Sequence, residues 1–185
     1  MWPWPYKRRE SPTLLFELMS GLEPRGFVWV ISDRLAVSER IGGYGFQHRR
    51  VRRSEEIVWL LEAGITSVLS LLPGNQNLAA YESAHLAIGS KPLEGELDMD
   101  IASDVHLAID EMLAEPGAVV LVHRDTVDDE VAGLLCGYLI HAGLIDDPIV
   151  AISIIQEIIG RPLGPLGRRL LPEPEPDPAA KGKGG

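Results

Sequence analysis

The stretch from residue 118 to residue 141 constrains the fold of this chain more than any other. Residues 118–122 (Ala-Val-Val-Leu-Val) are uniformly apolar and rich in valine, which predicts a strand buried on both faces. A polar loop follows, and residues 129–141 have the pattern of a helix, with Gly143 just past its end. A buried strand that feeds a helix is the repeating unit of a parallel sheet covered by helices.

The same alternation of strands and helices continues on the amino-terminal side. Strands are predicted at 27–31, 34–37, 65–72 and 85–88, and helices at 54–63, 78–84, 98–114 and 147–159. Ser54 suits the N-cap of the first helix, and Gly64 follows its end. The pattern therefore predicts an α/β fold with a central, mainly parallel sheet flanked by helices. Ligands of such sheets bind beyond the carboxyl ends of the strands, which is where the loop 123–130 lies.

The chain of 185 residues is expected to form one domain, over residues 26–162, with an extension at each end. Residues 1–25 read as an N-terminal extension, in which the run 13–19 suits a short amphipathic helix. Residues 163–185 are predicted to form a disordered tail, because the chain from Pro172 onward is charged and rich in proline and glycine.

Charge and composition narrow the class of protein. A formal net charge of −10 argues against nucleic acid as a partner. The one cysteine, Cys136, falls within a helix pattern and is expected to be a core residue with a raised pKa. No apolar run reaches the roughly 18 residues of a membrane span. The N-terminus also lacks the order of a signal peptide, so we expect a cytoplasmic protein.

Several separated pieces, taken in order, resemble the dual-specificity branch of the protein tyrosine phosphatase family. They lie at residues 29–31, 34–36, 59–65, 70–73 and 120–123, the last being Val-Leu-Val-His. The resemblance covers roughly residues 26–162 and implies a phosphatase-like fold of the dual-specificity type. In active members a His-Cys-x5-Arg loop follows the last strand. Its Cys thiolate attacks phosphorus, and its Arg clamps the phosphate.

His123 matches this loop, but the two residues that perform the chemistry are replaced. Arg124 stands in the place of the nucleophilic Cys, and Glu130 stands in the place of the Arg. The segment between them has no glycine, and residues 124–130 sum to a charge of −3, which opposes a phosphate dianion. The resemblance therefore implies a loop without a catalytic residue. The further carboxylates of this loop are Asp125, Asp128 and Asp129, and the acids that could otherwise have protonated a leaving group are Glu94, Glu96 and Asp98.

These observations lead to two hypotheses about function. The first is a catalytically inactive phosphatase-like domain that acts as a protein-binding or regulatory module, with another protein as its partner. The alternative is a divergent phosphatase or hydrolase of the same type with residual or altered activity. No cofactor is expected, and no metal, because the carboxylates have no recognised ligand spacing. The residues assigned to partner binding are the degenerate loop (His123, Arg124, Asp125, Asp128, Asp129 and Glu130) and a basic rim (Arg49, Arg50, Arg52 and Arg53).

Some of these features have a second interpretation that stays open at this point. Thr126 and Asp129 resemble a capping box, which would make the loop purely structural, and a small cationic ligand is a further alternative. The basic run 48–53 fits a solvated loop as well as a site for an acidic partner. A peripheral membrane anchor is one interpretation of the N-terminal aromatic and basic residues; packing onto the domain or onto a second subunit is another. These residues are Trp2, Trp4, Lys7, Arg8 and Arg9.

Overall fold

A computed structural model describes residues 20–43, 50–74 and 76–172. Its centre is a five-stranded sheet with the strand order β1-β2-β5-β3-β4. The edge strand β1 (Val28–Ile31) pairs antiparallel with β2 (Leu35–Glu39). The pairs β2/β5, β5/β3 and β3/β4 are parallel, where β3 is Ser67–Ser70, β4 is Ala87–Ser90 and β5 is Val120–Arg124. The predicted α/β class with a mainly parallel sheet is confirmed.

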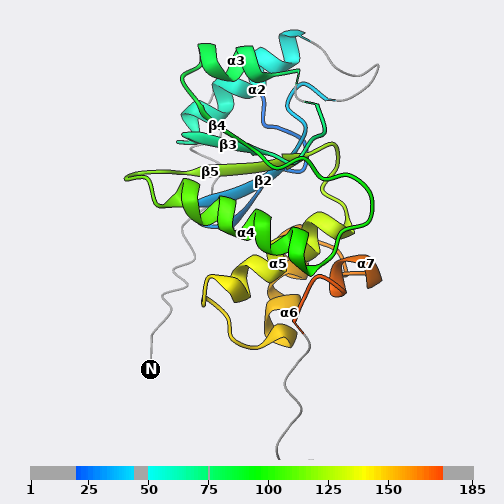
Figure 1. The fold of residues 1–185 in the computed structure, drawn as a ribbon. Helices are drawn as coiled ribbons and strands as arrows, with labels where there is room; N and C mark the ends of the chain where they lie inside the picture. Colours follow the sequence, from blue (N-terminus) through cyan, green and yellow to red (C-terminus); the bar gives the residue numbers. More distant parts are fainter. Residues whose placement is uncertain (1–19, 44–49, 75, 173–185) are drawn as a thin grey trace, which may run out of the picture.

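Helices cover both faces of the sheet (Figure 1). One face carries α2 (Arg50–Glu62) and α3 (Leu78–Ser83). The opposite face carries α4 (Met99–Leu113), α5 (Asp129–His141), α6 (Pro148–Ile159) and the short α7 (Pro165–Arg168). The apolar strand residues alternate between these layers, as the twofold period of a strand requires. Ala36 and Leu121 join the core under α2, and Val37 and Val122 join the core under α5.

The strand register places the loop after β5 at the middle of one edge of the sheet. His123 lies opposite Ser38 of β2 on one side and Ser70 of β3 on the other. Arg124 lies opposite Glu39. The carboxyl ends of three parallel strands therefore meet at this loop, as predicted from the order of elements.

Two local predictions were wrong. Helix α2 begins at Arg50, so Ser54 is not its N-cap; the Ser54 hydroxyl instead donates to the Arg50 carbonyl at 3.1 Å, within the helix. The strand expected at 85–88 is β4, which begins at Ala87. His85 has φ of +58° and belongs to the turn after α3. The apolar residues that follow it led the sequence pattern to predict a strand that begins too early.

The chain after α6 is ordered further than the sequence suggested. Leu163, Leu170 and Leu171, expected in a disordered tail, are buried against the core on the α5 side of the sheet. Helix α7 packs against α5 at a very short distance, since a Cβ on Gly133 would lie 2.3 Å from the Gly167 carbonyl oxygen. The ordered domain therefore extends to at least Leu171. No helix in the described ranges is long and apolar enough to cross a membrane.

Replacing Gly133 with alanine is expected to lower the free energy of unfolding by about 1–3 kcal/mol, because the added methyl group would force α7 away from α5. Urea denaturation of the full chain measures the change. Gly74→Ala is the matched control, since a Cβ there would meet no atom within 4 Å. Equal stability of both variants would contradict the close contact between α5 and α7.

Candidate functional site

His123 forms the buried floor of the site. Its side chain is fully buried, and among the described residues neither ring nitrogen has a hydrogen-bond partner. The Tyr81 ring packs edge-on against it, with 6.1 Å between ring centroids. Burial lowers the pKa of His123 to about 3, and the nearby positive charge of Arg40 acts in the same direction. The imidazole is therefore neutral at physiological pH, and it helps to position the end of β5 without taking part in proton transfer.

Arg124 and Glu130 form an ion pair across the loop. The Arg124 Nη1 atom lies 3.1 Å from Glu130 Oε2, and both side chains are mostly buried, with exposed fractions of 18% and 15%. The same Nη1 atom lies 3.4 Å from Asp128 Oδ2. Arg124 and Glu130 thus neutralise each other, and low exposure makes the pair stronger than a surface salt bridge.

The other loop carboxylates also have partners within the domain. Asp125 Oδ1 lies 3.0 Å from Arg40 Nε, and Arg40 Nη2 donates to the Gly74 carbonyl at 3.2 Å. Arg40 follows β2, so this ion pair connects the carboxyl ends of two neighbouring strands. The Asp125 carboxylate is therefore paired with a cation of the same domain.

Asp128, rather than the predicted pair of Thr126 and Asp129, caps helix α5. The Asp128 carboxylate accepts a hydrogen bond from the Val131 backbone N–H at 3.0 Å, and Asp128 has the extended backbone of an N-cap. Asp129 instead accepts hydrogen bonds from the backbone N–H groups of Gly164 at 2.5 Å and Gly167 at 2.7 Å. The capping-box prediction was wrong because the Asp129 carboxylate reaches the segment after α6, which the sequence had assigned to a disordered tail.

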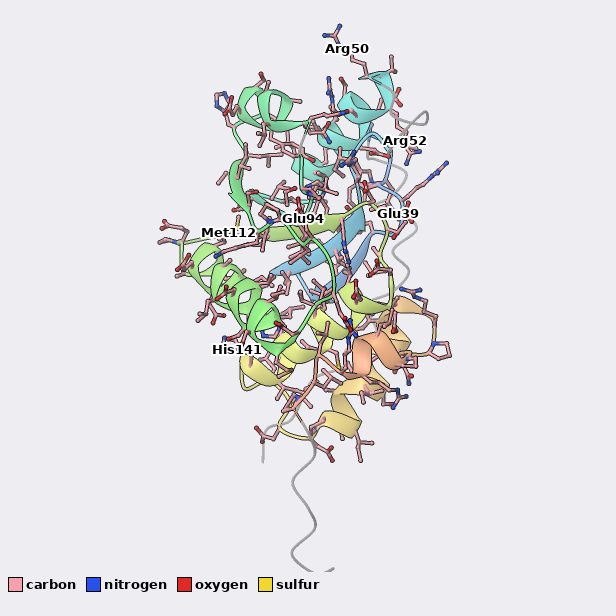
Figure 2. All side chains as sticks on the ribbon, turned by 45° about the vertical axis from the view of Figure 1, so that its right-hand side comes forward. Glu39, Arg50, Arg52, Glu94, Met112 and His141 are labelled. Atoms are coloured by element: carbon pink, nitrogen blue, oxygen red, sulfur yellow. The ribbon has the colours of Figure 1, made fainter. Side chains whose placement is uncertain are left out.

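Arg169 joins the loop to the segment that precedes α4. It forms ion pairs with Glu130, at 3.4 Å, and with Glu96. The neighbouring acid Asp98 caps α4, accepting from the Ile101 N–H at 2.9 Å. Glu94 lies in the same segment (Figure 2). An open hollow of about 550 Å³ lies between this segment and Arg169; its lining residues are Glu96, Leu97, Asp98, Met99, Asp100 and Arg169.

The residues predicted as a basic rim divide into different roles. Arg52 donates to the buried Glu56 carboxylate at 2.6 Å, and Glu56 also accepts from the Gly42 N–H. Arg53 reaches Asn77 Oδ1 at 3.5 Å and is half-buried. Arg50, at the first residue of α2, is exposed and extends outward (Figure 2). Arg49 lies outside the described residues, as do Trp2, Trp4, Lys7, Arg8 and Arg9.

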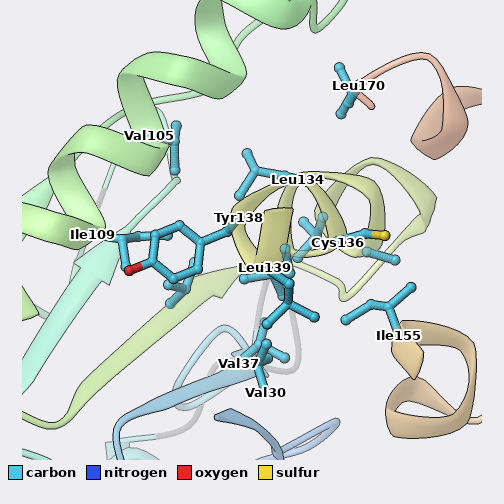
Figure 3. Packing of buried hydrophobic residues seen from close by; sticks show 14 of the residues in the cluster. Val30, Val37, Val105, Ile109, Leu134, Cys136, Tyr138, Leu139, Ile155 and Leu170 are labelled. Atoms are coloured by element: carbon cyan, nitrogen blue, oxygen red, sulfur yellow. The ribbon is translucent and has the colours of Figure 1, made fainter. Parts of the chain in front are cut away.

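Cys136 lies in the core, as the sequence predicted. Cys136 belongs to the same cluster of buried residues as Leu134, Ile155 and Leu170 (Figure 3). The residue is fully buried, and burial raises the pKa of its thiol to about 12. The thiol is therefore protonated at physiological pH and separated from the loop by nearly two turns of helix α5.

The loop residues thus come together at one edge of the sheet, and the sequence alone missed two of their partners. Arg40 and Arg169 supply the positive charges that balance the loop. Arg40 could have been found, because it follows a predicted strand whose carboxyl end meets the same edge. Arg169 lies in the segment that was assigned to the tail. Within the described ranges, no group of three or more His, Cys, Asp or Glu side chains is arranged to hold a metal ion.

No protein-family model matches the sequence, and no curated protein sequence does either. The structure is similar to solved phosphatases. The first is kinase associated phosphatase with its catalytic-site cysteine replaced by serine (TM-score 0.63, 14% identity, 80% of this chain and 92% of that chain). The core catalytic domain of the PP-IP phosphatase SIW14 from S. cerevisiae has a TM-score of 0.60 at 14% identity, covering 88% of this chain and 93% of that one. Human DUSP28 has a TM-score of 0.53 at 16% identity, covering 81% and 93%. The chain has the mixed α/β fold of dual-specificity phosphatases.

Acidification is expected to destabilise the protein between pH 6.5 and pH 5. The pKa of His123 is depressed in the folded state, so the unfolded chain binds the proton first, near pH 6.5, and stability present above that pH is lost as the pH falls. The loss is about 1.4 kcal/mol per pH unit for a histidine that stays neutral when folded. Burial also lowers the pKa of His106, which adds to the effect.

Urea denaturation at pH 7.5 and pH 5 measures this dependence. His123→Gln is expected to remove one histidine's share of the slope. An identical slope in the wild type and His123→Gln would show that His123 does not carry the pH dependence.

The Arg124–Glu130 ion pair is expected to give a coupling free energy of about 1 kcal/mol or more in a double-mutant cycle of Arg124→Gln and Glu130→Gln. Each single change leaves a mostly buried charge with only its more distant partner, Asp128 for Arg124 and Arg169 for Glu130, while the double change removes both charges. The Arg169–Glu96 pair provides the control: with Glu96 78% exposed, its coupling is expected below about 0.5 kcal/mol. Equal coupling for the two pairs would contradict the assigned role of burial.

Proposed function

We propose that this chain is a catalytically inactive phosphatase-fold domain that serves as a protein-binding or regulatory module. The fold is that of dual-specificity phosphatases, and we take the loop after β5 as the counterpart of their phosphate-binding loop. The proposal depends on what that loop contains.

The observation that carries the proposal is the ion pair between Arg124 and Glu130. In the His-Cys-x5-Arg pattern these are the positions of the nucleophile and of the phosphate clamp. Here they hold a guanidinium and a carboxylate 3.1 Å apart. A guanidinium has no electron pair to offer to phosphorus, and a carboxylate at the clamp position repels a phosphate oxygen. The pair supports a loop that neither binds nor cleaves a phosphate monoester.

Cys136 does not substitute for the missing nucleophile. The reaction needs a thiolate, and burial holds this thiol in its protonated form with a pKa of about 12. The acids Glu96 and Asp98 are also engaged, the first with Arg169 and the second as the cap of α4. Asp98 therefore has a structural role as a helix cap, and the exposed Glu96 is paired with Arg169.

Contact with a partner protein would use the parts of the loop that remain accessible. Asp125 and Asp128 have side chains exposed by 48% and 41%, whereas Arg124 and Glu130 are largely covered. Arg50 is the member of the described basic rim that projects freely from α2. We assign Asp125, Asp128 and Arg50 to this contact. Arg52 and Arg53 instead bind within the domain.

Hydrolysis of a generic aryl phosphate tests the inactivity. The full-length wild type is expected to match the rate without protein. The variant Arg124→Cys/Glu130→Arg restores the thiolate and the clamp, and it is expected to gain measurable turnover because the frame around the loop is retained. Arg124→Ser/Glu130→Arg is the matched control, since it restores the clamp without a thiol and stays silent.

Turnover by the wild type above the rate without protein would overturn the proposal. If Cys136→Ser then abolished that turnover, the nucleophile would be Cys136. If Cys136→Ser left it unchanged, the alternative of a divergent hydrolase with another nucleophile would stand. Near-ultraviolet circular dichroism of each variant confirms that a silent protein is folded.

A further inference from the structure

The outer side of helix α2 carries apolar side chains that nothing in the described part of the chain covers. Val58 and Leu61 are 41% and 45% exposed, while Ile57 and Leu60, on the inner side of the same turns, are buried in the core. Leu22, which lies beside this helix, is 46% exposed. Three large apolar residues in one place are unusual for a helix whose other outer residues include Glu55 and Glu62.

The chain enters the fold at this same place. The Leu22 N–H donates to the Glu55 carbonyl at 3.2 Å, and Ser20 donates to the Glu62 carboxylate through its N–H at 3.0 Å and its hydroxyl at 2.6 Å. Gly21 passes so close that a Cβ there would lie 2.3 Å from the backbone nitrogen of Trp59. These contacts fix the start of the described chain at the last turns of α2, next to Leu61.

The segment that immediately precedes this anchor is apolar. Residues 13–19 read Thr-Leu-Leu-Phe-Glu-Leu-Met, with apolar side chains on adjoining positions of a predicted helix. A helix of seven residues is not stable alone in water and needs a surface to pack on. At about 1.5 Å per residue its length of about 10 Å is close to the roughly 9 Å of α2 from Glu55, which binds Leu22, to Leu61.

We propose that residues 13–19 dock on the outer side of α2 and cover Val58, Leu61 and Leu22. The inference is independent of the proposed function, because α2 lies on the sheet face opposite α5. Since Ser20 is already hydrogen-bonded to Glu62, docking residues 13–19 on α2 costs little chain entropy.

Charge and area favour this occupant over a lipid surface or a second copy of the chain. The exposed carboxylates Glu55 and Glu62 border Val58 and Leu61, so an anionic membrane would be repelled, whereas Lys7, Arg8 and Arg9 of the same extension complement them. Three half-exposed side chains also fall short of the roughly 800 Å² that each partner buries in a stable interface.

Cysteine trapping in the full chain tests the contact directly. Leu15→Cys/Leu61→Cys and Leu18→Cys/Leu61→Cys are oxidised mildly at low protein concentration, and Cys136 does not compete because it is fully buried. At least one pair is expected to form an intramolecular disulfide about tenfold faster than its control, which places the second cysteine at Leu107. Leu107 is a fair control because it is 50% exposed but lies on α4, across the sheet.

Thermal unfolding of the full chain provides the second readout. Val58→Asp/Leu61→Asp and Leu15→Asp/Leu18→Asp are each expected to lower Tm by about 3–6 °C, and the four changes together to lower it by little more than either pair. Leu107→Asp is expected to leave Tm unchanged. Additive losses, together with no preferential disulfide, would overturn the proposal.

The competing occupants give distinct results. Disulfides that form only between chains, with a dimer mass by light scattering that Val58→Asp/Leu61→Asp abolishes, would assign the surface to a second copy. Co-sedimentation with phosphatidylserine vesicles that Leu15→Asp/Leu18→Asp abolishes, without an intramolecular disulfide, would assign the segment to a membrane. Either result overturns the proposal.

Discussion

The structure at the carboxyl end of β5 depends on one constraint, which is that the negative charges of the loop after this strand must be compensated within the domain. Four carboxylates lie between Asp125 and Glu130, at the start of a helix that is otherwise buried. The positive end of the helix dipole stabilises some of this charge, but by only about 0.3–1 kcal/mol for each group. The rest is balanced by three arginines from different parts of the chain, Arg40, Arg124 and Arg169. The loop shape therefore follows from the partner that each carboxylate meets within the domain, which is an arginine for Asp125, Asp128 and Glu130 and two backbone N–H groups for Asp129.

The segment after α6 owes its order to the same loop. Asp129 turns away from its own helix and accepts two backbone N–H groups of the following segment, and the Gly133–Gly167 contact brings α7 against α5 without intervening side chains. Each backbone N–H bound by a carboxylate forms a charge-assisted hydrogen bond, about twice as strong as a neutral one. Leu163 and Leu170 then complete the core on that face. The loop thus connects the sheet to the C-terminal helices through these contacts.

The sequence predicted what depends on local periodicity. Helix α5 was predicted with its observed bounds, Asp129–His141, and the apolar run that precedes it lies in the central strand, because a buried strand–loop–helix unit has an unambiguous pattern. Predictions of helix caps failed where a polar side chain has more than one possible hydrogen-bond partner. Asp128 and Asp129 are both competent caps, and only the tertiary approach of Gly164 and Gly167 decides which of them caps the helix. Ser54 has the character of a cap but lies within a helix that begins one turn earlier. Arg169 follows a proline and glycine pattern that local rules assign to a tail.

A phosphate-binding loop of a phosphatase and the loop after β5 in this chain differ in how their charges are balanced. A cradle of backbone N–H groups and a clamping arginine is an open positive site, and its charges are fully satisfied only when an anion is bound. Here the Arg124 guanidinium meets the Glu130 carboxylate, so these two charges are balanced without a bound anion. An anion that entered would have to separate Arg124 from Glu130 and then face Asp125 and Asp128. Of the side chains in residues 124–130, Val127 packs against the hydrophobic core, and the charged ones do not belong to it. The loop therefore holds its shape through ion pairs formed within the domain.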